Sequence, residues 1–419
     1  MTPARAQQIA RSFDLRALPD DFYADPYPVY DLLRASSPVH RMPDGSWFLT
    51  RYADLVAVYR DAQTFSSDKR VEFAPKYKNG ALFEHHTTSL VFNDPPLHTR
   101  VRKLIMGALT RRSISSMEGA LTVLVDRLLD QAARQGGGDL IDDFASAIPV
   151  EVIGNLLGVP MADRSPLRGW SLAILGALES TLTPQQEELG NTSVLAFCDY
   201  LRGLVAERRK HPGDPEHDVL TRLIQGEEQD GGEPLSEQEL LHNCIFILNA
   251  GHETTSNLIG NALVCLEHHL QARSDLVREL QATPGADAQR AILDCAVDEF
   301  LRFESSNQLG NRRSRTACTV GGVALPAGAL ITLCIGAANR DPAQFRNPAQ
   351  LDLRRADNRH LAFGFGIHQC AGLSLARLEG RVAIGRFLAR FPAYRLTGTP
   401  QRSARARFRG FLHARFVTG

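Results

Sequence analysis

The sequence predicts a mainly α-helical fold with a small β region, and two observations support this class. Apolar residues recur at helical spacing over most of the 419 residues. Strand-like runs occur in only two places, "SWFLTRY" at residues 46–52 and "GGVALPAGALITL" at residues 321–333. Because helices and strands do not alternate along the chain, we do not expect a doubly wound sheet.

The composition is that of a globular protein, with 43% hydrophobic and 22% charged residues. Basic and acidic side chains balance at 47 each, whereas a nucleic-acid-binding domain is normally basic. The first residues lack the apolar segment of a signal peptide, and the most apolar stretch, residues 329–338, is too short to cross a membrane as a helix. The seven cysteines include no CxxC pair. We therefore expect a reduced, cytoplasmic protein with no nucleic-acid partner and no membrane span.

The clearest predicted element is a long helix that follows an expected loop at residues 225–235. Ser236 and Glu239 form a capping box, and Leu235 with Leu240 suits the hydrophobic staple outside it. No proline follows until about His269, which gives a helix of roughly 50 Å at ~1.5 Å per residue. Its middle is apolar on nearly every face, which is typical of a helix buried in a core. The stretch "NAGHETTSN" at residues 249–257 nevertheless places a carboxylate, hydroxyls and amides there, which indicates a site.

A second helix is predicted after the stretch "FGFGIHQCAG" at residues 363–372. Cys370 then lies near a helix N-terminus, where free N–H groups and the helix dipole favour a thiolate. Three glycines in the same stretch allow the backbone to turn and to approach a flat group closely. A single thiolate with no second cysteine nearby suits one axial bond to haem iron.

Two other interpretations of this stretch compete with a haem site. An isolated cysteine in a glycine turn is usually a buried free thiol. A dinucleotide-binding fingerprint would need a third glycine where Gln369 stands.

The stretch resembles the haem-binding loop of the cytochrome P-450 family, F-G-x-G-x-H-x-C-x-G, at every fixed position. The resemblance extends from "DPYPVYDLLRASSPVH" at residues 25–40 to "RGFLHARF" at residues 409–416. It implies one cytochrome P-450 domain over residues 1–419, although length alone would suggest two or three domains. Haem b, iron protoporphyrin IX, would lie between the long helix and the helix after Cys370. Cys370 would be the axial ligand, and Phe363, His368 and Gly372 would contact the cofactor.

Within the long helix, "AGHETT" at residues 250–255 resembles the oxygen-activating segment of that family. Glu253 and Thr254 would then relay the protons that O–O cleavage requires, with bulk water kept away. Outside so apolar a helix, the same residues would be a helix cap or a solvated run. A zinc site is excluded, because H-E-x-x-H requires a histidine where Ser256 stands.

The resemblance also implies four partners for the haem propionates: His98, Arg102, Arg312 and His368. The first two lie in "HTRVR", four residues apart on one helix face. Arg binds carboxylates bidentately, although a solvated basic face is the ordinary interpretation of such a run. The spacing favours Arg312 but leaves Arg313 and Arg315 open.

"EFLR" at residues 299–302 matches the E-x-x-R pair of the family, which we assign a structural role. Glu299 and Arg302 would contribute little on a surface and would be costly to break if buried. Gln350 stands where many relatives have the arginine that completes this network. Arg355 or His360 must replace it, unless the network is smaller.

By position against the family, seven residues should line the substrate pocket: Val91, Phe92, Phe246, Asn249, Ala250, Gln308 and Phe411. Asn249 replaces a residue that is usually apolar, which suggests a polar group on the substrate met by Asn249 or Gln308. The alternative, that these amides bind water or backbone, is equally acceptable.

The resemblance implies a monooxygenase that inserts one atom of dioxygen into a small organic substrate. Electrons would come from NAD(P)H through a ferredoxin-type partner, because the chain has no flavin or iron–sulfur segment. The docking surface would offer four cations: Arg100, Lys103, Arg111 and Arg112. A peroxide-driven peroxygenase and a non-catalytic haem-thiolate sensor are the rival functions, and the Glu253–Thr254 pair argues against both.

Overall fold

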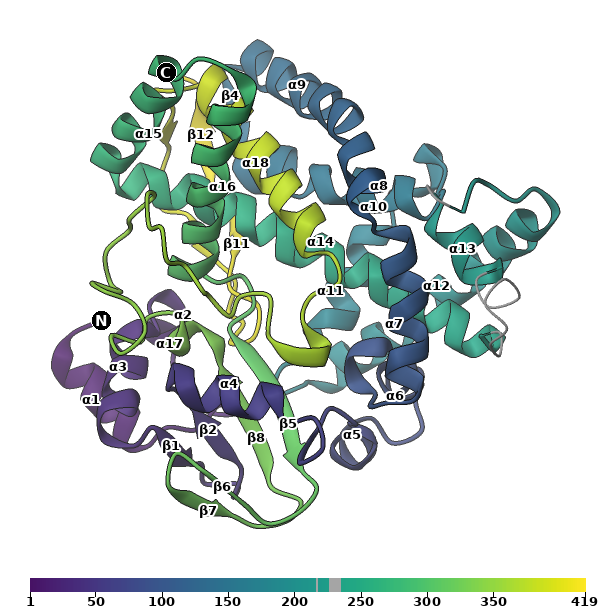
Figure 1. Ribbon diagram of the computed structural model, residues 1–419, viewed down its shortest axis with the longest axis vertical. Coiled ribbons are helices and arrows are strands. Elements are labelled where there is room, and N and C mark those ends of the chain that lie inside the picture. The colour runs from purple at the N-terminus through teal and green to yellow at the C-terminus, as the bar shows by residue number, and fades with distance from the viewer. Residues whose placement is uncertain (216–217, 226–234) are drawn as a thin grey trace.

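The computed structural model describes residues 1–215, 218–225 and 235–419, and its ribbon is mostly helical (Figure 1). The α-helices are α1 (Pro3–Arg11), α2 (Asp20–Ala24), α3 (Tyr27–Ser36), α4 (Tyr52–Arg60), α5 (Arg70–Tyr77), α6 (Ala81–Thr88), α7 (Leu97–Ala108), α8 (Arg111–Ser116), α9 (Glu118–Gln135), α10 (Ala147–Leu156), α11 (Leu167–Gly176), α12 (Pro184–Lys210), α13 (Val219–Gln225), α14 (Glu237–His268), α15 (Leu270–Ala282), α16 (Ala286–Phe303), α17 (Ile335–Ala338) and α18 (Leu373–Arg390).

Short turns of 3-10 helix lie at Leu90–Phe92, Met161–Asp163 and Gly366–His368, and a π-helical turn lies at Leu140–Ala145. The strands are β1 (Val39–Arg41), β2 (Trp47–Leu49), β3 (Phe65–Ser66), β4 (Gly137–Asp139), β5 (Leu309–Ser314), β6 (Cys318–Val320), β7 (Val323–Leu325), β8 (Leu330–Cys334), β9 (Arg395–Leu396), β10 (Gln401–Arg402), β11 (Phe411–His413) and β12 (Arg415–Val417).

The first predicted strand region and the second half of the other lie side by side in one sheet, whereas Val323–Leu325 pairs with Cys318–Val320 in a separate two-stranded sheet. The strand order of the larger sheet is β1-β2-β8-β5-β3, with Trp47 opposite Ile331 in the parallel β2–β8 pair and Leu309 opposite Cys334 in the antiparallel β5–β8 pair. This sheet occupies the end of the molecule that also carries α1 and α4, away from α9 and α18 (Figure 1). The prediction of a mainly helical fold with a small β region is confirmed.

Helix α14 begins and ends as the sequence predicts. The Ser236 side chain accepts a hydrogen bond from the Glu239 N–H, the Glu239 carboxylate accepts one from the Ser236 N–H, and the helix ends at His268. Most of its side chains are buried between neighbouring helices. The predicted loop at residues 225–235 falls mostly on residues 226–234, which lie outside the described residues; Gln225 itself is the last residue of α13.

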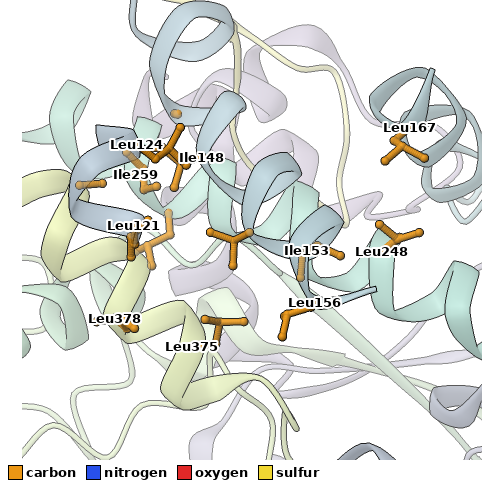
Figure 2. Close-up of a cluster of buried hydrophobic side chains, with 14 of the residues drawn as sticks. Leu121, Leu124, Ile148, Ile153, Leu156, Leu167, Leu248, Ile259, Leu375 and Leu378 are labelled. Atoms are coloured by element: carbon orange, nitrogen blue, oxygen red, sulfur yellow. The ribbon is translucent and has the colours of Figure 1, made fainter. Parts of the chain in front are cut away.

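The core around α14 holds α18 and α10 against it. Figure 2 shows leucine and isoleucine side chains of these three helices, among them Ile259, Leu375, Leu378 and Ile148, in one cluster. Close packing with α10 requires glycine at position 251, because an added Cβ would lie 2.3 Å from Cδ1 of Ile153. α18 contacts α14 directly, so the helix that follows Cys370 is anchored on the helix that carries Glu253.

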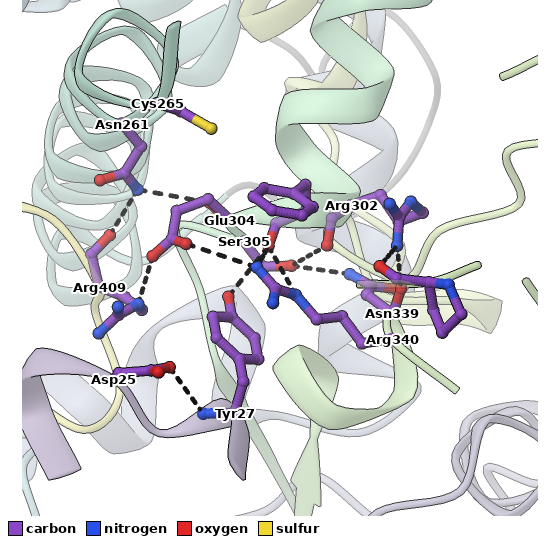
Figure 3. Close-up of polar contacts among 12 residues, drawn as sticks. Asp25, Tyr27, Asn261, Cys265, Arg302, Glu304, Ser305, Asn339, Arg340 and Arg409 are labelled. Carbon is purple, nitrogen blue, oxygen red and sulfur yellow. Dashed lines mark hydrogen bonds and ion pairs between the residues drawn. The ribbon is translucent and has the colours of Figure 1, made fainter. Parts of the chain in front are cut away.

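A buried polar network joins the end of α16 to Tyr27 of α3 and to Arg409 of the loop between β10 and β11 (Figure 3). The Glu304 carboxylate pairs with Arg409, with Arg402 at 3.2 Å and with Arg340 at 3.8 Å. Burial alone would raise the pKa of Glu304, but these three cations lower it to about 2. Tyr27 donates to the backbone oxygen of Phe303 at 3.1 Å. In the described part of the chain, no helix is both long and apolar enough to cross a membrane.

Candidate active site

The cysteine loop is built by two glycines in the left-handed region. Gly364 has φ +65° and Gly366 has φ +73°, and an added Cβ at Gly366 would lie 2.3 Å from the backbone oxygen of Tyr59. The Cys370 N–H donates to the Phe363 oxygen at 2.8 Å, which closes the loop. Helix α18 begins at Leu373, so the half-buried thiol lies three residues before it, as predicted.

The charge of the free Cys370 thiol differs from the expectation. Burial raises its pKa above the ordinary value, and this outweighs the opposing effects of the Gly372 N–H, Arg102 and Arg377. The predicted effect of the helix end is present in the Gly372 N–H, but it does not outweigh burial in the free thiol. A metal ion bonded to the sulfur would supply the missing positive charge.

Four basic side chains from three segments meet near this loop: His98, Arg102, Arg312 and His368. The rings of His98 and His368 lie 4.1 Å apart between centroids. Both ring nitrogens of His98 and Nε2 of His368 are buried without a hydrogen-bond partner in the described residues. Burial, followed by Arg312, His98 and Arg102, lowers the pKa of His368 to about 2.

The two arginines of this cationic cluster have no carboxylate partner among the described residues. Arg312 donates to the Asn311 oxygen at 2.7 Å and lies 5.1 Å from the Tyr59 ring. Arg315 instead pairs with Asp94 at 2.6 Å, which removes it as the alternative to Arg312. Arg102 is half-buried beside Cys370.

These residues fit a haem group. Two unpaired guanidiniums and unpartnered imidazole nitrogens suit two propionate carboxylates, and one sulfur suits one axial bond. An added Cβ at Gly372 would have only the Cys370 sulfur within 4.0 Å, so the space beside the thiol is open.

Helix α14 is uncovered along one stripe in its otherwise buried middle. Phe246 and Thr254 are half-buried and Ala250 is exposed, and these residues follow one another at intervals of four. Three of the predicted site residues therefore share one open face of α14.

The Thr254 hydroxyl donates to the Ala250 oxygen at 2.8 Å on this open face. The Glu253 carboxylate is buried, and its Oε1 lies 2.5 Å from Nη1 of Arg405, while Oε2 has no partner among the described residues. Burial raises the pKa of Glu253 to about 7, against the opposing effect of Arg405. An acid that ionises near neutral pH thus lies next to a hydroxyl in the chain.

Arg405 was not found from the sequence. It lies 152 residues from Glu253 in a loop after β10, and no motif or spacing connects the two.

Two residues that were expected in the pocket point into packed protein instead. The Asn249 side chain is buried, and its Oδ1 accepts from the Ser171 hydroxyl of α11 at 2.7 Å. Gln308 is buried beside Gly336 and donates to the Ser305 oxygen at 2.8 Å. Gln308 thus bonds backbone, as the alternative interpretation has it, whereas Asn249 bonds a serine side chain. Nδ2 of Asn249 and Oε1 of Gln308 have no partner among the described residues.

The other expected pocket residues lie on different elements. Val91 and Phe92 are half-buried in the 3-10 turn before α7, where the Phe92 ring packs 5.5 Å from that of Phe73. Phe411 is buried in β11 with the Arg402 guanidinium 4.0 Å from its ring.

The Glu299–Arg302 pair is completely buried in α16. Arg302 donates to both carboxylate oxygens of Glu299, at 2.8 and 2.7 Å. Arg355 adds a third member at 3.0 Å, whereas His360 lies beside Asp298. Gln350 contributes only its backbone oxygen, which accepts from Arg302 at 3.1 Å.

The expected docking cations are not equivalent. Arg100 pairs with Glu239 at 2.5 Å, so its charge is not free for a partner. Arg111 and Arg112 are exposed at the start of α8.

Comparisons with known proteins agree with this geometry. Residues 173–411 match the family model described as Cytochrome P450. The chain is 34% identical to the biotin biosynthesis cytochrome P450 of Bacillus subtilis, over 90% of this chain and 91% of that protein. It is 37% identical to the vitamin D(3) 25-hydroxylase of Pseudonocardia autotrophica, over 88% and 87% of the two chains.

Solved structures show the same likeness. P450BioI in complex with an acyl carrier protein ligated to hexadec-9Z-enoic acid superposes with a TM-score of 0.87 at 32% identity, over 95% of this chain and all of that one. The Bacillus subtilis polyketide synthase cytochrome P450 PksS superposes with a TM-score of 0.84 at 31% identity, over 97% of this chain and all of that one.

Proposed function

The chain belongs to the cytochrome P450 family of haem-dependent, oxygen-incorporating oxidoreductases, and from this premise we propose the roles of its residues and its substrate. Cys370 provides the axial sulfur ligand. The four basic residues of the cationic cluster hold the propionates. Haem supplies the reductive activation of dioxygen, with one oxygen atom inserted into the substrate and the other released as water.

The single observation that carries this proposal is the cationic cluster beside Cys370. Arg102 and Arg312 gather there with no carboxylate partner in the described residues, beside the unpartnered ring nitrogens of His98 and His368. Guanidinium groups taken out of water without an anionic partner are costly, so a dianionic group at this place satisfies them.

Proton delivery falls to Glu253 and Thr254. A buried carboxyl with a pKa of about 7 both takes up and gives up a proton near neutral pH. The Thr254 hydroxyl lies on the open face of α14, where it would pass a proton toward an oxygen bound at that face. The packed helices around α14 limit the entry of bulk water.

The substrate is an apolar organic molecule that lies along the open stripe of α14. Phe246 and Ala250 offer it apolar surface. Phe92, which precedes α7 in the chain, is a further apolar side chain of the proposed pocket. The relatives named above include one solved with an acyl carrier protein that holds a fatty acid, which supports long apolar substrates.

Electrons come from NAD(P)H through a ferredoxin-type protein, and the exposed Arg111 and Arg112 belong to its docking surface. The seven cysteines are all free thiols, which supports a cytoplasmic location.

The test of this proposal is the absorption spectrum of haem-loaded, reduced protein under carbon monoxide. We expect the red-shifted band of a thiolate ligand, and we expect Cys370→Ser to lose it. Cys318→Ser is the matched control, since Cys318 is a half-buried thiol in β6, and it should keep the band. A wild-type protein without the band would refute the proposal.

Turnover assays separate the rival functions. Product formed with NAD(P)H and a ferredoxin system, but not with peroxide alone, supports the monooxygenase. Product with peroxide alone would favour the peroxygenase, and no product under either condition across apolar ligands that shift the haem spectrum would favour a sensor.

A further inference from the structure

The loop between β10 and β11, residues 403–410, reaches across to α14 through one side chain. Nη1 of Arg405 lies 2.5 Å from Oε1 of Glu253, and Nη2 donates to the Leu172 oxygen of α11 at 3.2 Å. Gly176 leaves room for this guanidinium, since an added Cβ would lie 3.2 Å from Nη2. Among the described residues, Arg405 is the cation that pairs with the acid of the site.

The same loop is anchored by the connection between α11 and α12, residues 177–183. The Glu179 carboxylate accepts from the N–H of Ala406 at 3.1 Å and from the N–H of Arg407 at 3.3 Å. These are the two residues that follow Arg405, so Glu179 fixes the backbone from which the Arg405 side chain extends.

Helix α5 holds this connection from the other side. Lys76 Nζ donates to the backbone oxygen of Glu179 at 2.5 Å, and the Tyr77 hydroxyl donates to the backbone oxygen of Ala177 at 2.5 Å. A continuous chain of contacts therefore runs from α5 through the α11–α12 connection and the loop at residues 403–410 to Glu253 on α14.

We propose that Arg405 is a positioning residue for Glu253, and that Glu179 keeps Arg405 in place through the backbone of the loop at residues 403–410. With the Glu179 bonds made, the backbone of the loop holds Arg405 where its charge favours the ionised form of Glu253 and directs the carboxylate toward α11. This inference rests on the proposed function, because it concerns the acid of that site.

The electrostatics of the site give the expected direction. Burial raises the pKa of Glu253, Arg405 opposes this by charge and hydrogen bond, and the nearby Glu179 carboxylate raises it further. Removal of the Arg405 charge leaves burial and Glu179 unopposed. The pKa of Glu253 must then rise above its value of about 7.

The test is a pH titration of Glu253 itself in the haem-loaded protein. Its carboxylic acid C=O infrared band is assigned by its loss in Glu253→Gln. In Arg405→Gln we expect the midpoint to move up by about one to three pH units, since an opposite charge at this distance shifts a carboxyl by that much. Arg405→Lys should restore most of the wild-type midpoint. The pH profile of product formed per electron should move in the same direction.

Two further variants test the connection to the loop. Glu179→Asp keeps the negative charge that raises the pKa of Glu253 but shortens the side chain that accepts from the Ala406 and Arg407 N–H groups, so it should move the midpoint upward by less than Arg405→Gln does. Arg407→Gln is the matched control, because Arg407 bonds the Leu309 oxygen and Asn311 and has no bond to Glu253. It should leave the midpoint unchanged.

An unchanged midpoint in Arg405→Gln, or an equal shift in Arg407→Gln, overturns the role of Arg405. An unchanged midpoint in Glu179→Asp overturns the role of Glu179 as the anchor of this loop. The carbon monoxide spectrum keeps these failures apart from failure of the proposed function. A thiolate band together with an unshifted Glu253 titration in Arg405→Gln refutes this inference alone. Absence of the band in the wild type refutes the haem-thiolate proposal.

Discussion

At the scale of single residues, Thr254 joins the chemistry of the site to the geometry of α14. Its hydroxyl bonds the Ala250 oxygen one turn earlier, on the face that other helices leave open. A threonine in this arrangement competes for a backbone oxygen and also presents a hydroxyl to the open face.

We predict that Thr254→Val lowers product formation per electron on the order of 10²-fold, because valine keeps the shape and removes the proton-carrying hydroxyl. Consumed oxygen should then appear as hydrogen peroxide, measured beside product in a coupled assay. Thr255→Val is the control, because Thr255 is buried away from the stripe. Equal product yields in the two variants would contradict the role of Thr254.

Glu379 is a further buried acid, and it lies in α18 without a partner for Oε2 in the described residues. Burial raises its pKa to about 8, so the folded protein holds this proton at pH 7 while the unfolded chain releases it. Its contribution to stability is therefore complete below the unfolded pKa, near 4.5, and is lost as pH rises through about 8.

Glu379→Gln should remove this pH dependence and stabilise the protein at pH 7 by on the order of 3 kcal/mol. Urea unfolding at pH 5, 7 and 9 measures the effect, which should be smallest at pH 5. A gain in stability that is equal at all three pH values would show that Glu379 does not carry the dependence.

At the scale of elements, the Glu299–Arg302–Arg355 network ties α16 to the segment between α17 and the cysteine loop. Arg302 donates to the oxygens of Asn339 and Pro348 as well as to Glu299. The backbone N–H of Asp352 donates to the Glu299 carboxylate at 2.8 Å. The network therefore holds the long irregular segment that leads to Cys370.

We predict that Arg302→Leu destabilises the protein by about 3–5 kcal/mol, because it leaves the Glu299 carboxylate buried without its main partner. Chemical denaturation of the haem-loaded protein measures this loss. The control is Arg354→Leu, since Arg354 pairs with Glu279 at 2.8 Å on an exposed part of the surface and should cost about 1 kcal/mol or less. Similar losses in both variants would refute a buried structural role.

The elements also show where sequence reasoning stopped. The capping box and glycine loop were predicted because each depends on residues within a few positions of one another. The third member of the Glu299 network was left open between Arg355 and His360, because both lie more than 50 residues from Glu299. Packing selects Arg355 and turns His360 toward Asp298.

At the scale of the whole molecule, the proposed haem joins separate parts of the chain. Arg102 lies on α7, Arg312 on β5, and Cys370 before α18. A ligand that binds these segments together in the folded state, and not in the unfolded chain, stabilises the whole fold.

Haem loading should therefore raise the free energy of unfolding by about 2.7 kcal/mol when free haem is at 100 times its dissociation constant. Thermal unfolding of apo and loaded protein measures this gain. At the same free haem concentration, the double variant Arg102→Gln/Arg312→Gln should reduce this gain because it binds haem more weakly, whereas Arg315→Gln, whose partner is Asp94, should not. The same gain in all three proteins would show that the cationic cluster does not hold haem.

The sequence by itself determined the helical class, the bounds of α14, the cysteine loop and the residues of the family motifs. These depend on periodicity, caps and glycine turns, which act over a few neighbouring residues. Only the tertiary structure decided that Arg405 meets Glu253, that the Ser171 hydroxyl bonds Asn249, and that burial raises the pKa of the free Cys370 thiol. Such outcomes depend on which distant segments pack together and on the removal of water from charged groups, and neither is written in local spacing.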